Sequence, residues 1–212
     1  MKFTTLFFDV DDTLYPADCG LWQAIKARIG QYMQERLGIP AEEIPALRQQ
    51  YYEKYGTALK GLEFHYPVKV QEYLDYVHDV PLERYLRPQP ELAAALKALP
   101  ARKFLLTNAD AGHASRVSAA LGLENCFEGV IDVAAMSPYC KPMPEAFQRA
   151  LSLAGGPSPA RCAFFDDLPR STRAARALGI FSVLVSAAPP EDASCADAWL
   201  GDWSQLPGLL AG

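Results

Sequence analysis

The 212-residue sequence has few residues suited to zinc or disulfide chemistry. It contains only three histidines, which do not cluster, so a zinc site is not expected. Its five cysteines are odd in number and form no C-x-x-C pair. We interpret them as reduced thiols, most of which fill the core of a cytoplasmic protein. A chain of this length buries enough surface to fold without disulfide bonds.

Long apolar runs and excess positive charge are also missing. No segment approaches the roughly 18 apolar residues of a membrane span, and the apolar run near the N-terminus is interrupted by Asp9. The formal net charge of −5 argues against nonspecific binding to nucleic acid phosphates. We therefore expect a monomer or homodimer that acts on small molecules and binds neither membranes nor nucleic acid polymers.

The sequence pattern changes near residue 17 and again near residue 89. Residues 17–87 show helical periodicity, with apolar residues on one face between Leu21 and Leu37 and further helices over Pro45–Tyr55 and Val68–Val77. From about residue 89, strands alternate with helices, which favours βαβ units and a parallel sheet covered on both faces. The predicted strands of this part cover residues 103–106, 127–133, 161–165 and 181–185, and a last short strand and helix fall between residues 199 and 210.

Aromatic residues are divided between the same two parts. Nine of the ten tyrosines lie between Tyr15 and Tyr85, whereas nine of the ten phenylalanines lie outside that interval. Phenylalanine suits a dry sheet core, and tyrosine suits a thin helical layer with one wet side. We predict an α/β catalytic core of three layers, formed by residues 1–16 and 88–212, with an inserted all-helical cap domain of residues 17–87.

Polar residues follow three of the predicted strands. In open parallel sheets, ligands bind beyond the carboxyl ends of the strands, and these ends lie along one edge. The first apolar run ends in an acid cluster, a later strand ends in a Thr-Asn pair, and another ends in two aspartates. A lysine lies in a proline-rich loop between the Thr-Asn pair and the two aspartates. We expect one site to contain Asp9, Asp11, Thr107, Asn108, Lys141, Asp166 and Asp167.

Clustered carboxylates are costly to bury unless a cation lies among them, and a hard divalent metal prefers such oxygen ligands. We predict a metal held by Asp9, by the Asp166/Asp167 pair and by a loop carbonyl. Taken alone, each motif is also compatible with helix capping or an ordinary turn. Their combination at matching strand ends favours a catalytic site.

The charges suggest a role for each group. Asp9 could attack phosphorus and form an aspartyl phosphate. Asp11 could protonate the leaving alkoxide and then activate water. Thr107, Asn108, Lys141 and the backbone of the acid loop could stabilise the transferring oxygens.

These motifs, D-x-D-x-T, T-N, K-P and D-D in this order, resemble those of the haloacid dehalogenase superfamily of phosphohydrolases. The resemblance implies a Rossmann-like core with a helical cap after the first motif. It also implies that Asp9 is the nucleophile and Asp11 the acid/base. Mg²⁺ would bind Asp9, the backbone carbonyl of Asp11, and Asp166 or Asp167.

A narrower resemblance concerns substrate. Residues 8–16, 55–62 and 107–117 resemble the pyrimidine 5'-nucleotidase branch, which removes phosphate from mononucleotides such as UMP and CMP. Cys140 precedes Lys141 where a glycine is common, and residues 168–172 read Leu-Pro-Arg-Ser-Thr rather than the commoner Ser-x-x-Asn. The resemblance implies a pyrimidine mononucleotide as substrate. We assign substrate binding to Val10, Asn108, Lys141 and Tyr55.

The motifs leave several alternative functions. A phosphatase for a sugar phosphate or phosphoglycolate, or a phosphomutase, would use the same acids. A haloacid dehalogenase would leave Asp11, Asp166 and Asp167 without a role, and intact motifs argue against a non-catalytic binding module. We expect His113 to cap or pack near the start of its helix. The aromatic residues around Tyr55 either pack within the cap or stack on a nucleobase.

Overall fold

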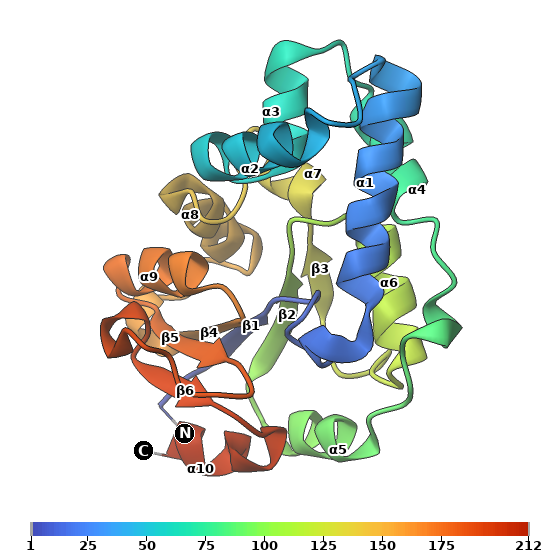
Figure 1. Cartoon of the computed structure of the whole chain (residues 1–212). Helices are drawn as coiled ribbons and strands as arrows, with labels where there is room; N and C mark the ends of the chain where they lie inside the picture. The colour runs from blue at the N-terminus through green and yellow to red at the C-terminus, as the bar shows by residue number, and fades with distance from the viewer. Residues whose placement is uncertain (1, 212) are drawn as a thin grey trace. The chain divides into compact units, whose positions relative to one another are not determined.

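The computed structural model describes residues 2–211, which form two compact units. The first unit contains the residues up to Ala17 and those from Leu86 onward, and the second contains Asp18–Tyr85. All strands belong to the first unit, whereas the second is helical (Figure 1). None of the helices described between residues 2 and 211 has both the length and the apolar character needed to cross a bilayer.

The first unit is built on a six-stranded parallel sheet with the order β3-β2-β1-β4-β5-β6. The central strand β1 pairs with β2 on one side and β4 on the other, and Phe7 lies opposite both Phe104 and Phe164. Because all strands run in parallel, the residues that follow β1, β2 and β4 emerge at one edge. The strands are β1 (Thr5–Phe8), β2 (Arg102–Leu106), β3 (Gly129–Ile131), β4 (Cys162–Asp166), β5 (Phe181–Val185) and β6 (Ala198–Leu200).

Helices cover both faces of this sheet. On one face, Phe7 and Phe164 are buried against Phe147 of α8. On the other, the rings of Phe8 and Phe165 stack at 4.6 Å, and Trp203 lies against both. Figure 1 shows α8 and α9 on one side and α5 and α6 on the other. These helices are α5 (Pro90–Ala98), α6 (Ala111–Ala120), α7 (Val133–Met136), α8 (Pro144–Leu153), α9 (Pro169–Ala177) and α10 (Leu206–Ala211).

The predicted α/β fold class, with a parallel sheet and a helical insertion, is therefore confirmed. The strand predicted over Phe127–Val133 is shorter in the structure, because Val133 already begins α7. The side chain of Asp132 accepts a hydrogen bond from the backbone N–H of Ala135 (2.8 Å) and caps this short helix. The strand therefore ends at Ile131, two residues before the end predicted from the apolar pattern.

The second unit contains four α-helices. The helix over Ala58–His65 was not among the predicted ones, because Gly61 in its interior lowers helix propensity. The glycine is required by packing, since a Cβ atom there would overlap the ring of Tyr51. Thr57 caps this helix by accepting a hydrogen bond from Lys60 N–H (3.1 Å). The four helices are α1 (Leu21–Leu37), α2 (Ile44–Tyr55), α3 (Ala58–His65) and α4 (Val70–Val77).

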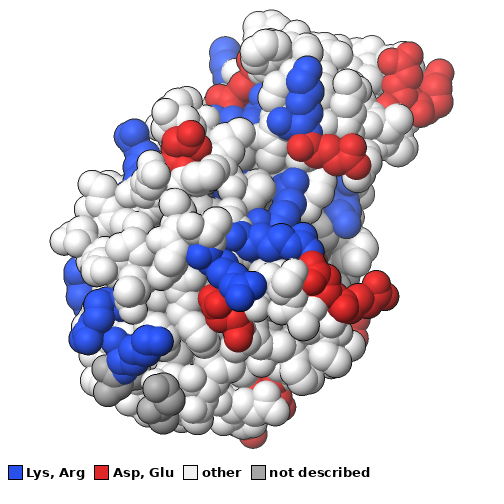
Figure 2. Space-filling model, turned by 90° about the vertical axis from the view of Figure 1, so that its left-hand side faces the viewer, with Lys and Arg blue, Asp and Glu red and all other residues white. Residues whose placement is uncertain are grey.

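Short 3-10 helices connect several of these elements. They cover Ala17–Cys19, Leu82–Arg84, Pro159–Arg161, Ala193–Cys195 and Trp203–Gln205. On the face drawn in Figure 2, basic and acidic side chains lie next to one another in several places. Two ion pairs join α9 to the C-terminal segment, Arg173 to Asp192 and Arg176 to Asp197. These arginines are thus engaged by neighbouring acids.

Candidate active site

The loop after β1 presents Asp9 at the edge of the sheet. The backbone N–H of Asp9 donates to the carbonyl of Phe165 (2.9 Å), so this residue continues the pairing of β1 with β4. The chain then turns tightly, and the Val10 carbonyl accepts hydrogen bonds from Thr13 N–H (3.3 Å) and Leu14 N–H (3.0 Å). The side chain of Val10 is fully buried. Substrate binding by Val10 stays a prediction.

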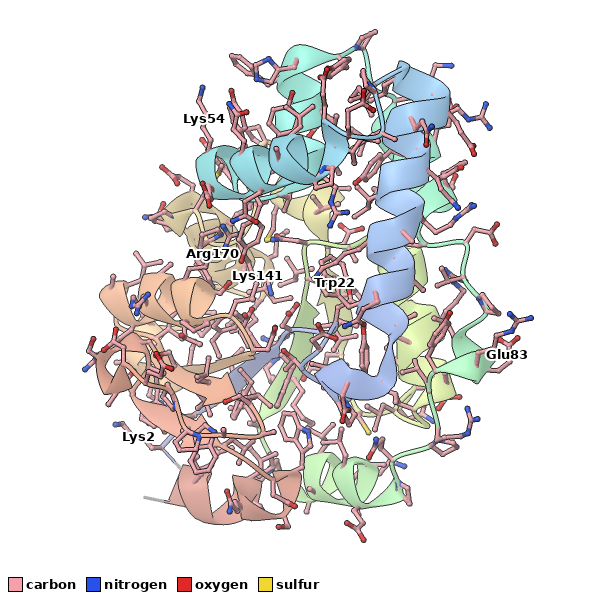
Figure 3. The ribbon with its side chains drawn as sticks, in the orientation of Figure 1. Lys2, Trp22, Lys54, Glu83, Lys141 and Arg170 are labelled. Atoms are coloured by element: carbon pink, nitrogen blue, oxygen red, sulfur yellow. The ribbon has the colours of Figure 1, made fainter. Side chains whose placement is uncertain are left out.

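Lys141 lies between two of the expected acids. Its Nζ is 2.7 Å from Asp9 Oδ1 and 2.7 Å from Asp166 Oδ2, and all three side chains are buried. Figure 3 labels Lys141. Burial raises the pKa of Asp9 to about 7 against the attraction of Lys141, and the charge of Asp166 adds to the rise. Burial alone would lower the pKa of Lys141, but Asp166 and Asp9 raise it to about 12. Lys141 is therefore an ammonium ion at neutral pH.

Asn108 fixes the loop that carries this lysine. Its side-chain Nδ2 donates to the Lys141 carbonyl (2.9 Å), and its Oδ1 accepts from the Lys141 backbone N–H (2.9 Å). The neighbouring Thr107 is buried, and its hydroxyl accepts from Ala109 N–H (3.0 Å). Asn108 thus holds the loop before α8, although it lies 33 positions from Lys141 in the sequence.

The two aspartates after β4 lie beside Asp9. Asp166 is fully buried, and its Oδ1 accepts a hydrogen bond from Leu168 N–H (2.8 Å). The hydroxyl of Thr13 accepts from Asp167 N–H (3.0 Å) and donates to Asp167 Oδ1 (3.3 Å). Oxygens of Asp9, Asp166 and Asp167 all lie within 4.8 Å of one another. The expected acids of two strand ends are therefore brought together.

This acid group fits a hard divalent cation. Three ionised carboxylates around the single charge of Lys141 would leave a surplus of two negative charges. The repulsion affects Asp167, whose pKa is raised to about 8, first by burial and then by the charges of Asp166 and Asp9. The available donors are oxygen atoms, which Mg²⁺ prefers. The described residues thus contain a suitable Mg²⁺ site in both charge and ligand type.

Asp11 is held by two side chains that were not assigned to the site from the sequence. Its Oδ1 lies 2.6 Å from the hydroxyl of Tyr15 and 2.8 Å from Nε2 of His113. As expected, the backbone of His113 takes part in the helix start, where its N–H donates to the cap residue Asp110 (2.8 Å). Its imidazole ring additionally contacts Asp11. Burial raises the pKa of Tyr15, and the charge of Asp11 adds to this rise, so Tyr15 stays protonated and donates.

A sequence signal for these two residues exists but is weak. Tyr15 follows Asp11 by four positions in the same loop, and His113 lies in the first turn of the helix that follows the Thr-Asn pair. Both segments leave strands at the same edge of the sheet. Proximity to the acid cluster could thus be inferred, whereas the contact itself could not.

Tyr55 belongs to the helical unit. Its hydroxyl lies 3.0 Å from Nε2 of His65, and its ring stacks on Phe64 with centroids 5.4 Å apart. Phe64 is largely exposed, while Tyr51 is buried and stacks on His65. These four side chains, Tyr51, Tyr55, Phe64 and His65, thus form one aromatic cluster, in which Phe64 is exposed. Substrate binding by Tyr55 stays a prediction.

The chain is similar to a known protein family and to a yeast protein. The family described as haloacid dehalogenase-like hydrolase matches residues 3–179. The yeast protein named Phosphate metabolism protein 8, from Saccharomyces cerevisiae, is 30% identical over 192 residues. That alignment covers 84% of this chain but only 60% of the yeast protein, so the chain spans less than two thirds of its relative.

Two solved structures share the fold at low identity. A HAD phosphatase from Thermococcus onnurineus has a TM-score of 0.67 and 16% identity, over 99% of this chain and 98% of that one. The L-2-haloacid dehalogenase from Xanthobacter autotrophicus has a TM-score of 0.62 and 18% identity, over 99% of both chains. One fold therefore serves two reactions, and the site has to distinguish them. The family match, which spans most of the chain, shows that this protein belongs to the haloacid dehalogenase-like hydrolases.

Proposed function

We propose that this hydrolase is a Mg²⁺-dependent phosphomonoesterase that works through an aspartyl phosphate. The observation that carries the proposal is the buried group at the end of β1, in which Lys141 joins Asp9 to Asp166 and Asp167 lies beside them. The α/β unit is the catalytic core and the helical unit the cap of a cytoplasmic enzyme. The five free thiols suit that compartment.

The residues divide the chemistry between them. An oxygen of Asp9 forms a bond to phosphorus while the bond to the leaving oxygen breaks, and Asp11 gives that oxygen a proton. Asp11, now a carboxylate, takes a proton from water as the water oxygen attacks phosphorus. Phosphate leaves and the Asp9 carboxylate is restored.

Lys141, Thr107 and Asn108 support these steps. Lys141 keeps Asp9 in place and offers positive charge to the phosphoryl oxygens, and Asn108 fixes its loop. Asp9, Asp166, Asp167 and the backbone carbonyl of Asp11 would hold Mg²⁺. When bound, the ion supplies positive charge that offsets the repulsion between these acids and an anionic substrate.

The composition of the site favours phosphate over halide chemistry. A halide leaves without protonation, so a dehalogenase needs neither an acid at Asp11 nor a metal. It would bury Asp166 and place Asp167 beside Asp9 without using them, at considerable electrostatic cost. The name of the yeast relative, which refers to phosphate metabolism, is in line with this assignment.

The substrate class is the finer part of the proposal. We infer that pyrimidine nucleoside 5'-monophosphates, UMP and CMP, are preferred, because three segments resemble the pyrimidine 5'-nucleotidase branch. The aromatic cluster around Tyr55 in the helical unit offers rings of the type that stack on bases. Alanine at Tyr55 should raise KM for UMP far more than for p-nitrophenyl phosphate, and equal effects would reject stacking.

A phosphate-release screen tests the proposed function. Nucleoside monophosphates, sugar phosphates and phosphoglycolate are compared with and without Mg²⁺. We expect Mg²⁺-dependent release that favours UMP and CMP and falls on the order of 10³-fold or more in Asp9→Asn. Asp79→Asn, at a largely exposed position, serves as the control. A flat profile would leave only the general function, and absence of release from all substrates would refute it.

A further inference from the structure

Two side chains from separate segments contact the same oxygen of Asp11. The Tyr15 hydroxyl and His113 Nε2 both approach Oδ1, at 2.6 and 2.8 Å. Tyr15 comes from the acid loop and His113 from the first turn of α6, so two separate segments determine where this carboxyl group lies. Both side chains are buried, which protects these bonds from competing water.

The direction of these two bonds decides which oxygen of Asp11 carries its proton. A carboxyl oxygen has two lone pairs, and two donors occupy both of them. The Tyr15 hydroxyl donates one hydrogen bond to Oδ1. The contact with His113 is a second bond of the same direction when the ring proton of His113 is on Nε2. In that tautomer both lone pairs of Oδ1 are engaged, and the exchangeable proton of Asp11 belongs on Oδ2.

We propose that His113, with its ring proton on Nε2, and Tyr15 are positioning residues that make Oδ2 the proton-exchanging atom of Asp11. This inference rests on the proposed phosphatase function. As the bond between phosphorus and the leaving oxygen breaks, its electron pair stays on that oxygen, which takes the proton from Oδ2. In the second half-reaction, Oδ2 takes a proton from the attacking water. His113 and Tyr15 hold the carboxyl plane in the same orientation through both steps and exchange no protons themselves.

The leaving group separates this role from a merely structural one. The alkoxide released from UMP needs protonation, whereas p-nitrophenolate leaves readily without it. kcat/KM covers events up to the first irreversible step, which includes phosphoryl transfer to Asp9. A positioning defect at Asp11 should therefore lower kcat/KM for UMP and largely spare p-nitrophenyl phosphate. A general loss of folding or packing would lower both equally.

The experiment measures kcat/KM for both substrates in Tyr15→Phe, His113→Leu and His113→Gln. If UMP is not cleaved, the best alkyl phosphate from the screen replaces it. We expect Tyr15→Phe and His113→Leu to lose about 10-fold or more on the alkyl phosphate and less than about 3-fold on p-nitrophenyl phosphate. His113→Gln should recover much of the activity, because its amide nitrogen can donate at a reach similar to Nε2. Tyr139→Phe, in the same unit, is the matched control and should change neither value.

The possible failures are distinguishable. Equal losses on both substrates in Tyr15→Phe, which removes only a hydroxyl group, would overturn the positioning role even if His113→Leu failed to fold. A glutamine variant no better than the leucine variant, with circular dichroism showing that both are folded, would overturn the donor role of His113. A wild-type protein without phosphatase activity would instead refute the proposed function, and this inference with it.

Discussion

Replacing Lys141 with methionine tests the charge balance of the candidate site. The substitution keeps most of the aliphatic stem and removes the ammonium group that lies 2.7 Å from oxygens of both Asp9 and Asp166. Because it leaves two buried carboxyl groups without their cation, we expect it to lower the free energy of unfolding by about 3–5 kcal/mol at alkaline pH. Urea unfolding in the presence of a chelator measures this change.

The loss should depend on pH in a defined direction. With Lys141 present, the folded-state pKa of Asp9 is about 7, above its unfolded value of 3.8. A raised carboxyl pKa contributes stability that is full below the unfolded value and lost as pH rises through the folded value. Below about pH 7, Asp9 is protonated in both proteins and contributes equally. Above it, only the wild type can ionise Asp9 beside a cation, so the difference should grow between pH 6 and pH 8.5.

Two further variants sharpen this measurement. Adding Asp166→Asn to Lys141→Met removes both charges of one pair and should restore part of the lost stability. Lys69→Met, at a side chain that is 85% exposed, should change the free energy of unfolding by less than about 0.5 kcal/mol. A loss below about 1 kcal/mol at pH 8.5, or one independent of pH, would refute the proposed electrostatic coupling.

Two more predictions concern the metal and the helical unit. Burial raises the pKa values of Asp9 and Asp167 to about 7 and 8, so metal-free protein should lose stability as pH rises from about 4 to 8. Mg²⁺ binds the ionised forms and should raise Tm more at pH 8 than at pH 5; equal shifts would contradict this. Gly61→Ala should destabilise the α2–α3 pair by about 1–3 kcal/mol through overlap with Tyr51, as measured by hydrogen exchange. Gly30→Ala, inside α1 with only ordinary contacts, should be neutral or stabilising, and similar losses in both variants would argue against the steric reason.

The sheet was predictable because its strands are short apolar runs bounded by turn residues. The strand predicted over Phe181–Val185 has the same limits in the structure. Helix α3 was not predicted, because the sequence shows the low helix propensity of Gly61 but not the ring of Tyr51 that requires it. Propensity is local, whereas the packing that overrides it is not.

The candidate site likewise has a part that the sequence predicts and a part that it does not. The positions of Asp9 and Asp166 followed from the rule that ligands bind at the carboxyl ends of parallel strands. The contact between His113 and Asp11 spans 102 positions and depends on side-chain direction, which neither periodicity nor spacing reports. Residues at strand ends could therefore be predicted, whereas the side chains that contact them, such as His113, could be identified only from the structure.

The place of β1 at the centre of the sheet has a consequence for biosynthesis. Thr5 pairs with Arg102 and Cys162, so this strand is translated long before either of its neighbours. Until they emerge from the ribosome, its aromatic side chains and unpaired backbone have no native partners and form a template for aggregation. The nascent chain should therefore depend on chaperones until β4 is complete, and truncation before Cys162 should yield insoluble protein.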